Sequence, residues 1–149
     1  MDVENMYYHG RINVPYKWYV GATGSRFLVG LRDGKEFWGI TCPKCGKVYV
    51  PPLKTCPECF VPNEEWVRLA DTGTVESFTV AHYSNGVSPS DIPYVLGLIK
   101  MDGADGSFLH YIGDADPADV KVGMRVKAVF ADERTGNIMD IKHFAPVNE

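Results

Sequence analysis

The chain has 149 residues, a net charge of −4 and hydrophobic residues at 45% of its positions, which are ordinary values for a globular protein of one or two small domains. No apolar run in the sequence approaches the roughly 20 residues of a membrane-spanning helix. The N-terminal residues also lack the apolar stretch of a signal peptide. We therefore expect a cytoplasmic protein without a membrane partner.

Acidic and basic residues are unevenly distributed along the sequence. Residues 69–149 hold six Lys and Arg against twelve Asp and Glu, which gives this half a net charge of −6. Proteins that bind nucleic acid usually present a basic patch, because the neutralisation of phosphates supplies much of their affinity. We therefore expect no nucleic-acid partner.

Residues 1–41 form an aromatic-rich N-terminal segment that holds eight of the 18 aromatic residues. Ser25 as an N-cap, apolar residues on one face and Gly34 as a stop predict a short helix over 25–34, followed by a strand over 35–41. The aromatic residues either fold back over the rest of the protein or anchor a protein–protein interface. The candidates for such an interface are Tyr16, Trp18, Tyr19 and Phe27.

Residues 42–68 contain all four cysteines, in the stretch CPKCGKVYVPPLKTCPEC. Each C-x2-C turn can direct two thiolates at one point, and two such turns complete a tetrahedral S4 metal site. We therefore predict a rubredoxin-like zinc ribbon with one structural Zn²⁺ per chain, with iron in the same S4 geometry as an alternative. The predicted ligands are Cys42, Cys45, Cys56 and Cys59.

Other uses of these cysteines fit the sequence less well. Disulfides need an oxidising compartment, and a thioredoxin-like pair needs a βαβ setting that is not evident here. Gly46 follows the first C-x2-C turn and can adopt the positive φ that such a turn often needs, whereas Phe60 follows the second turn. Because all four thiols serve as ligands, no cysteine is left as a catalytic nucleophile.

The sequence of residues 69–149 predicts short strands separated by turns, with no long helix. Five strands in about 75 residues favour a small OB-fold barrel, with a five-stranded sandwich as the alternative. The polar connection at 114–123 has room for a helical turn. The strands are expected at 74–83, 94–101, 107–113, 124–131 and 138–145. The whole chain is therefore predicted to be mainly β.

No catalytic constellation is visible in the sequence. It contains no nucleophile elbow, no Walker motif and no dinucleotide-binding glycine motif. Three histidines fall in or beside expected strands without the spacing of a metal site, and we interpret them as structural residues. They are His82, His110 and His143.

The order of the three segments, together with several short motifs, resembles a known protein family. Nearly end to end, the chain is similar to the zinc-ribbon plus OB-fold proteins associated with acyl-CoA metabolism. Members of this family are accessory subunits of thiolases and of 3-hydroxy-3-methylglutaryl-CoA synthase-like enzymes. The matching motifs are FLVGLRDGK before the ribbon, CPKCGKVYVPP at 42–52, GTVESFTV at 73–80, IPYVLGLIKMDG at 92–103 and VGMRVKAVF at 122–130.

The resemblance implies a non-catalytic subunit that docks on a thiolase-like catalytic subunit in a hetero-oligomer. The partner would supply the nucleophile and the oxyanion donors, and this chain would help to form or cover the CoA or acyl-CoA site. Degradation of a bulky aromatic or steroid acyl-CoA is the expected context. Candidate contacts to the CoA phosphates are Arg26, Arg32 and Lys35, all of which are also ordinary surface charges.

The alternative function from another class is a nucleic-acid-binding module built from a zinc ribbon and an OB barrel. This alternative depends on fold analogy, because OB barrels bind many kinds of ligand. The acidic barrel half argues against it. A rubredoxin-like electron carrier is a third hypothesis, which the red colour of bound iron would reveal.

Overall fold

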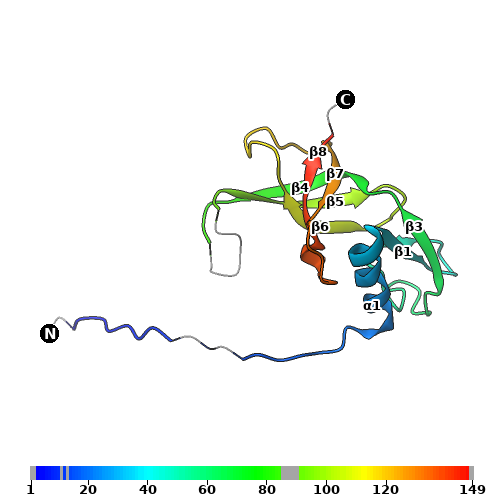
Figure 1. The fold of residues 1–149 in the computed structure, drawn as a ribbon, viewed down its shortest axis with the longest axis horizontal. Coiled ribbons are helices and arrows are strands. Elements are labelled where there is room, and N and C mark those ends of the chain that lie inside the picture. Colours follow the sequence, from blue (N-terminus) through cyan, green and yellow to red (C-terminus); the bar gives the residue numbers. More distant parts are fainter. Residues whose placement is uncertain (1–2, 11, 13, 85–90, 148–149) are drawn as a thin grey trace.

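A computed structural model describes residues 3–10, 12, 14–84 and 91–147 of the chain (Figure 1). One short helix and a small three-stranded sheet lie beside a barrel, and the N-terminal segment extends away from all of them (Figure 1). The first elements are α1 (Gly21–Val29), a π-helical turn (Gly30–Gly34), β1 (Phe37–Thr41), β2 (Val48–Tyr49) and β3 (Glu65–Leu69).

Five further strands form a closed barrel in the order β4–β5–β6–β8–β7. Neighbouring strands are antiparallel except β6 and β8, which run parallel and meet at Ile112 and Phe144. The predicted OB-type barrel is therefore confirmed, and the sandwich alternative is wrong. The strands are β4 (Thr72–Ala81), β5 (Tyr94–Met101), β6 (Ser107–Ile112), β7 (Arg125–Phe130) and β8 (Ile141–Pro146), with a 3-10 turn at Ile138–Asp140.

The alternation of residue types along the barrel strands decides which side chains enter the core. In β5, Val95, Ile99 and Met101 are buried, whereas Leu96, Leu98 and Lys100 are more exposed. This is the two-residue period of a strand with one face on a core. Gly97 lies on the inner side as well, where an added Cβ would come within 2.5 Å of the Ile112 side chain. The strand therefore needs glycine at this position to let β6 pack closely.

The helix and the small sheet share one apolar core with the barrel. Phe37 of β1 is fully buried, and its ring centroid lies 6.2, 5.8 and 6.2 Å from those of Phe108, Phe130 and Phe144 in the barrel. Leu31 is also completely buried. Burying a side chain of this size contributes about 1.5–3 kcal/mol. The zinc-ribbon sheet is therefore packed firmly against the barrel.

The helix begins earlier than the sequence predicts. It starts at Gly21, so Ser25 lies inside the helix and the predicted N-cap is wrong. Val20 occupies the N-cap position without a side-chain hydrogen bond, and Gly21 has a φ of 79°, a value that glycine adopts easily. The helical segment ends at Gly34, as predicted, and Lys35 follows it with a left-handed φ of 52°.

Two details of the predicted β structure also differ. The sheet strand β3 has no counterpart in the prediction, because it lies in the stretch assigned to the ribbon loops. The connection at 114–123, which had room for a helical turn, contains hydrogen-bonded turns. The stretch expected at 138–145 begins as a 3-10 turn before β8. Part of the predicted break at 84–93 lies outside the described residues.

The loop between β7 and β8 fastens the helical turn to the barrel. Nε of Arg134 donates to the backbone oxygen of Arg32 at 2.8 Å, and its guanidinium also donates to the oxygen of Ala131 at 3.0 Å. Asp140 is buried at the base of this loop and accepts from the backbone N–H of Gly136 at 2.8 Å. Because the bond to Arg32 joins the π-helical turn Gly30–Gly34 to the β7–β8 loop, this end of the helical segment is held against the barrel.

Candidate metal centre and interaction surface

The four cysteines converge on one point. Their sulfur atoms all lie within 4.8 Å of one another, and Sγ of Cys45 is 3.8 Å from Sγ of Cys56. A zinc ion with Zn–S distances of about 2.3 Å at the centre of a tetrahedron implies sulfur–sulfur distances of about 3.8 Å. The thiol cluster therefore has the size and donor set of a closed S4 site. With four protein ligands, such a site has no open position for catalysis.

The two C-x2-C turns have the same backbone structure. Gly46 N–H donates to the oxygen of Cys42 at 2.9 Å, and Phe60 N–H donates to the oxygen of Cys56 at 3.0 Å. The sulfur atoms of the same two cysteines also accept backbone N–H bonds at 3.4 Å, one within each turn. These N–H groups stabilise thiolate charge. Both turns are therefore built to present anionic sulfur to a cation.

Both residues that follow the turns have a positive φ. Gly46 has a φ of 75°, as the sequence predicts, and Phe60 has a φ of 56°. A bulky residue in this region is strained, because its Cβ approaches the backbone oxygen. The Phe60 side chain is also 82% exposed, so burial of its ring does not offset this strain. A strained and exposed aromatic residue of this kind is a candidate for contact with another molecule.

A tyrosine of β2 supports the sulfur cluster. The Tyr49 hydroxyl lies 3.3 Å from Sγ of Cys56. Burial alone would raise the pKa of the Cys56 thiol. The hydrogen bonds from Tyr49 and from the N–H groups of Cys59 and Glu58 outweigh burial and lower this pKa to about 6. Burial and the neighbouring sulfurs of Cys45, Cys56 and Cys42 raise the pKa of Cys59, to about 12. A bound divalent cation favours the thiolate form of all four ligands.

The three predicted CoA-phosphate residues contact different parts of the molecule. The Arg26 guanidinium lies 4.3 Å from the ring centroid of Trp66 and 5.2 Å from that of Trp38, so it joins α1 to β1 and β3 by cation–π contacts. Arg32 pairs with Asp33 at 2.7 Å. The two tryptophans that hold Arg26 were not identified from the sequence, because only the pairing of β1 with β3 brings them together.

Lys35 lies beside a polar hollow of about 330 Å³ between the helical turn and the start of the barrel. Arg68 and Asp71 line the same hollow, and Arg68 pairs with Glu36 at 3.0 Å. The Lys35 ammonium has no ion pair within the part of the chain that the structure describes. Of the three candidate cations, Lys35 is the one that makes neither an ion pair nor a cation–π contact among the described residues.

The four predicted interface residues fall into two groups. Tyr16, Trp18 and Tyr19 are each at least 70% exposed in an extended segment without secondary structure. Phe27 is only 3% exposed, and its ring lies 6.5 Å from that of Phe108. Phe27 faces the core because it lies on the inner side of α1. It therefore belongs to the fold and not to an exposed surface.

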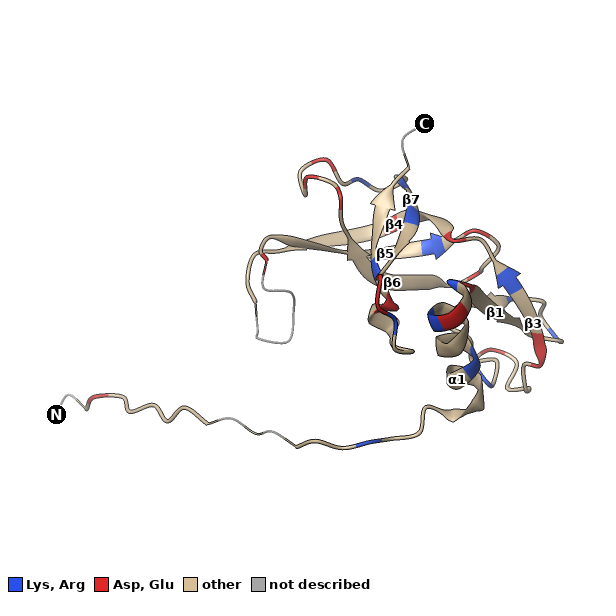
Figure 2. Ribbon diagram, viewed as in Figure 1, with Lys and Arg blue, Asp and Glu red and all other residues tan. Residues whose placement is uncertain are grey.

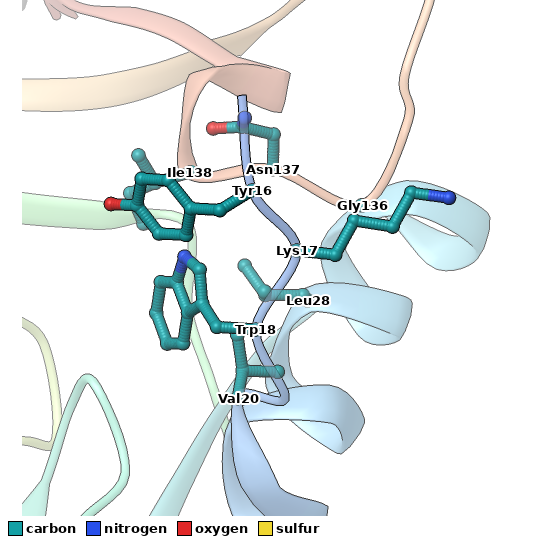
Figure 3. Close-up of a pocket in the computed structure, with 8 residues that line it drawn as sticks. All are labelled: Tyr16, Lys17, Trp18, Val20, Leu28, Gly136, Asn137 and Ile138. Carbon is teal, nitrogen blue, oxygen red and sulfur yellow. The ribbon is translucent and has the colours of Figure 1, made fainter. Parts of the chain in front are cut away.

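A cavity of about 620 Å³ lies where the extended segment joins the body (Figure 3). Figure 3 shows Tyr16 and Trp18 beside Ile138, with Leu28 of α1 behind them and Lys17 directed to the other side. The cavity could not be predicted from the sequence, because its walls come from three separated stretches. Its lining residues are Tyr16, Lys17, Trp18, Val20, Leu28, Gly136, Asn137 and Ile138.

The architecture, a zinc ribbon followed by an OB barrel, defines the class of this protein, and comparison with known families identifies it further. Two family models match consecutive parts of the chain. The model described as the rubredoxin-like zinc ribbon domain of ChsH2 matches residues 32–65, and the model of the C-terminal OB-fold domain of ChsH2 matches residues 66–131. The chain belongs to this ChsH2-type zinc-ribbon plus OB-fold family, also called DUF35.

Three curated relatives show similar levels of identity. A DUF35 domain-containing scaffold protein of Methanocaldococcus jannaschii is 34% identical over 93 residues, which is 62% of this chain and 65% of that protein. The benzoylsuccinyl-CoA thiolase subunit BbsA of Thauera aromatica is 32% identical over 80 residues, 47% of this chain and 54% of that protein. A probable enoyl-CoA hydratase alpha subunit of Thermomonospora curvata is 31% identical over 85 residues, 57% of this chain and 26% of that protein. The chain thus spans less than two thirds of each relative.

Two solved structures share the fold. A DUF35-family protein of unknown function from Sulfolobus solfataricus superposes with a TM-score of 0.63 at 26% identity and covers 85% of this chain and 84% of its own. The Ltp2–ChsH2(DUF35) aldolase gives a TM-score of 0.66 at 20% identity and covers 87% of this chain and 98% of the matched chain. The second likeness supports the fold alone.

Proposed function

We propose that this chain is a non-catalytic, zinc-binding subunit of a thiolase-type acyl-CoA complex. In this proposal, Zn²⁺ bound by the four cysteines keeps the ribbon folded, and the N-terminal segment docks on a catalytic subunit. The relatives named as a scaffold protein, a thiolase subunit and a hydratase subunit support an assembly role. A thiolase is the more specific choice of partner, because one relative is named a thiolase subunit. This chain has no cysteine outside the sulfur cluster, so the cysteine nucleophile of thiolase chemistry would come from the partner.

The observation that carries this proposal is the exposure of the N-terminal arm, defined here as the described residues from 3 to 19. It has no secondary structure, and its large apolar side chains are 65–95% exposed. An uncovered apolar surface of this kind marks an interaction site, and aromatic side chains dominate the binding energy of many interfaces. The exposed side chains are Val3, Met6, Tyr7, Tyr8, Ile12, Val14, Tyr16, Trp18 and Tyr19.

The distribution of charge also favours a protein partner over nucleic acid. In Figure 2, acidic residues mark several loops of the barrel, whereas the lysines and arginines are spread singly over strands and helix. The barrel strands carry few cations for a phosphate backbone, which an oligonucleotide-binding barrel needs. In the sequence, positions 3–19 hold two cations, Arg11 and Lys17, among nine large apolar residues. Hydrophobic anchoring therefore dominates the proposed contact.

A secondary part of the proposal concerns CoA. We place the contact to CoA phosphate at Lys35, since its ammonium is unpaired within the described residues, whereas Arg26 and Arg32 already hold other groups. A bulky aromatic acyl-CoA is the proposed substrate of the complex, because one relative is named for benzoylsuccinyl-CoA. The partner would provide the acyl site.

The proposal is tested by purifying the tagged chain from its native host and identifying the bound proteins by mass spectrometry. We expect a thiolase-family protein in near-stoichiometric amount, and we expect the Trp18→Ala variant to lose most of it. Tyr83→Ala is the matched control, because Tyr83 is an equally exposed aromatic residue of the barrel half. Recovery of RNA without a thiolase, or equal recovery of a thiolase with both variants, would contradict the proposal.

A further inference from the structure

The barrel contains a second cavity, away from the zinc ribbon and the arm. It has a volume of about 390 Å³ and lies between β5, β6 and β8, with the loop that follows β6 on one side. Cavities of about 300–1,000 Å³ are typical of ligand sites. OB-fold proteins commonly bind their ligands on the corresponding strands, the second and third of the barrel. This cavity therefore occupies a position suited to binding.

A buried histidine lines the cavity with one nitrogen available. His143 is 9% exposed, and its Nε2 lies 2.8 Å from Oδ2 of Asp114. A carboxylate only accepts hydrogen bonds, so Nε2 is the donor of this contact, and in the neutral form of the ring Nδ1 is an acceptor. Within the described residues, Nδ1 of His143 has no hydrogen-bond partner. In its neutral form, this lining residue therefore has one ring nitrogen that can accept a hydrogen bond from a donor group.

The local backbone is shaped around this histidine. An added Cβ at Gly113 would lie 2.6 Å from the His143 ring, so only glycine lets the chain pass so closely. The next residue, Asp114, has a left-handed φ of 53°, which places its carboxylate on the ring. Aspartate tolerates this conformation better than most residues, although it remains uncommon. The backbone of this loop therefore fixes the contact between His143 and Asp114.

Two tyrosines form an aromatic part of the cavity lining. The Tyr94 and Tyr111 rings pack edge to face, with centroids 5.7 Å apart and planes at 79°. Both side chains are only half-buried, and the neighbouring Met139 is half exposed. A half-open wall of tyrosines can stack against a planar group, and its negative ring faces attract cations.

The charges around the cavity also favour a cation. Asp91 lines the cavity, and Asp114 lies behind His143. Asp116 lines a neighbouring hollow that shares Pro93 with this cavity. The exposed Lys142 also lines the cavity and balances the charge of Asp91, so the excess of negative charge comes from Asp114 and Asp116 beside the cavity. This excess is in keeping with the net charge of −6 of the barrel half.

We propose that this cavity receives a guanidinium group, the side chain of an arginine supplied by the bound partner protein. A guanidinium is planar, permanently charged and rich in N–H donors, so it can stack on the tyrosines while it donates to Nδ1 of His143 and to Asp91. Arginine is also enriched among the residues that dominate interface energy. The arginine source depends on the proposed function, whereas binding of the guanidinium itself can be tested without a partner.

The test is a titration of the full, zinc-loaded, ¹⁵N-labelled chain with N-acetyl-arginine N-methylamide, followed by NMR. We expect saturable shifts of the Gly113, Tyr111 and His143 signals, with a dissociation constant on the order of 1 mM for one isolated side chain. N-acetyl-citrulline N-methylamide has nearly the same shape without the charge, and we expect it to bind at least about tenfold more weakly. Shifts that do not saturate, or equal binding of the two compounds, would overturn the proposal.

Two variants locate the binding. Asp91→Asn is expected to weaken arginine binding about threefold or more, and Tyr111→Leu about fivefold or more, because they remove one charge and one stacking surface. Glu133→Gln is the matched control for the first variant, since Glu133 is exposed on the β7–β8 loop away from the cavity, and it should change nothing. Equal affinity of all three variants would place the binding elsewhere and contradict the assignment. If the three variants bind arginine equally and a thiolase still co-purifies with the chain, the arginine site is wrong but the proposed function is not contradicted.

Discussion

The aromatic residues of the first 41 positions divide into two regions with opposite surroundings. Phe27 and Phe37 lie in α1 and β1 and are buried against the phenylalanines of the barrel. Trp18 and Tyr19 lie only a few residues earlier, in the extended arm, and are exposed. A high aromatic content in one stretch of sequence therefore has two causes here. One set of rings builds the core, and the other is free for a partner.

The two groups can be separated by their sequence context. Around Phe27 the apolar residues repeat at helical spacing and include Leu31, which is also buried. In the arm, Ile12, Val14, Tyr16 and Trp18 occupy every second position, as in a strand, yet no described strand pairs with them. This alternating pattern is typical of a segment that pairs with another chain. The comparison predicts separate effects on stability and on binding.

The largest effect is expected from removal of the metal site. Cys45→Ser should lose zinc and, with it, the order of the ribbon, because structural zinc in sites of this type contributes on the order of 10 kcal/mol to folding. Zinc content is measured on the purified protein, and binding is measured by recovery of the partner. Lys44→Ala, an exposed neighbour in the same turn, should retain both. A zinc-free variant that still captures the partner would show that the metal is dispensable for docking.

The next prediction compares the two groups of rings directly. Phe37→Ala should lower the free energy of unfolding by about 3–5 kcal/mol, because it leaves a cavity between the ribbon and the barrel. Trp18→Ala should change it by less than about 0.5 kcal/mol, since the ring is exposed. Urea unfolding of the zinc-loaded proteins gives both values. Comparable losses of stability would mean that the arm packs on the body in solution.

A smaller effect concerns acid sensitivity of the barrel. Burial lowers the pKa of His110, which stacks on Phe108, below its usual value of 6.5. The unfolded chain therefore binds a proton at this ring more readily than the folded one. Stability from this residue is complete above about pH 6.5 and is lost as the pH falls from there towards the lowered pKa of the folded state.

The corresponding variant is His110→Phe. Compared with the zinc-loaded wild type, it should reduce the slope of unfolding free energy against pH below 6.5 by up to about 1.4 kcal/mol per pH unit. His9→Gln in the exposed arm should leave the wild-type slope unchanged. If the slope of the His110→Phe variant equals that of the wild type, His110 does not contribute to the acid sensitivity.

The smallest predicted effect on stability concerns the second zinc turn. Phe60→Gly should raise the free energy of unfolding by up to about 1 kcal/mol, because glycine adopts the positive φ of this position without strain. Gly46→Ala at the matching position of the first turn should lower it by a similar amount. Thermal unfolding with zinc in excess is a suitable measurement. A destabilised Phe60→Gly protein would indicate that the exposed ring has a packing role.

Much of the fold follows from local sequence. The cysteine spacing predicts the convergence of four sulfurs, and the apolar run between turn signals at 94–101 predicts β5 to the residue. The start of α1 could not be predicted in the same way, because Ser25 offers a good N-cap signal that tertiary packing does not use. The strand β3 was missed because its sequence has no strong alternation, and its pairing with β1 fixes it instead.

The candidate sites were less accessible to sequence reasoning. The position of Phe27 in the core depends on which face of α1 meets the barrel, and that is a property of the fold. The contact of Arg26 with Trp66 joins residues 40 positions apart. The barrel cavity combines Tyr94 with His143, which no local motif connects. A site made of residues far apart in sequence can be identified only when the arrangement of the strands in space is known.

The central claim is that the exposed arm binds a thiolase-type catalytic subunit. Hydrogen–deuterium exchange of the chain, alone and with that subunit, tests this claim most directly. We predict rapid exchange throughout the arm of the free chain, because its amides lie in exposed segments without secondary structure, and slowed exchange over residues 14–19 in the complex. A stable complex in which these amides still exchange as rapidly as in the free chain would contradict the account.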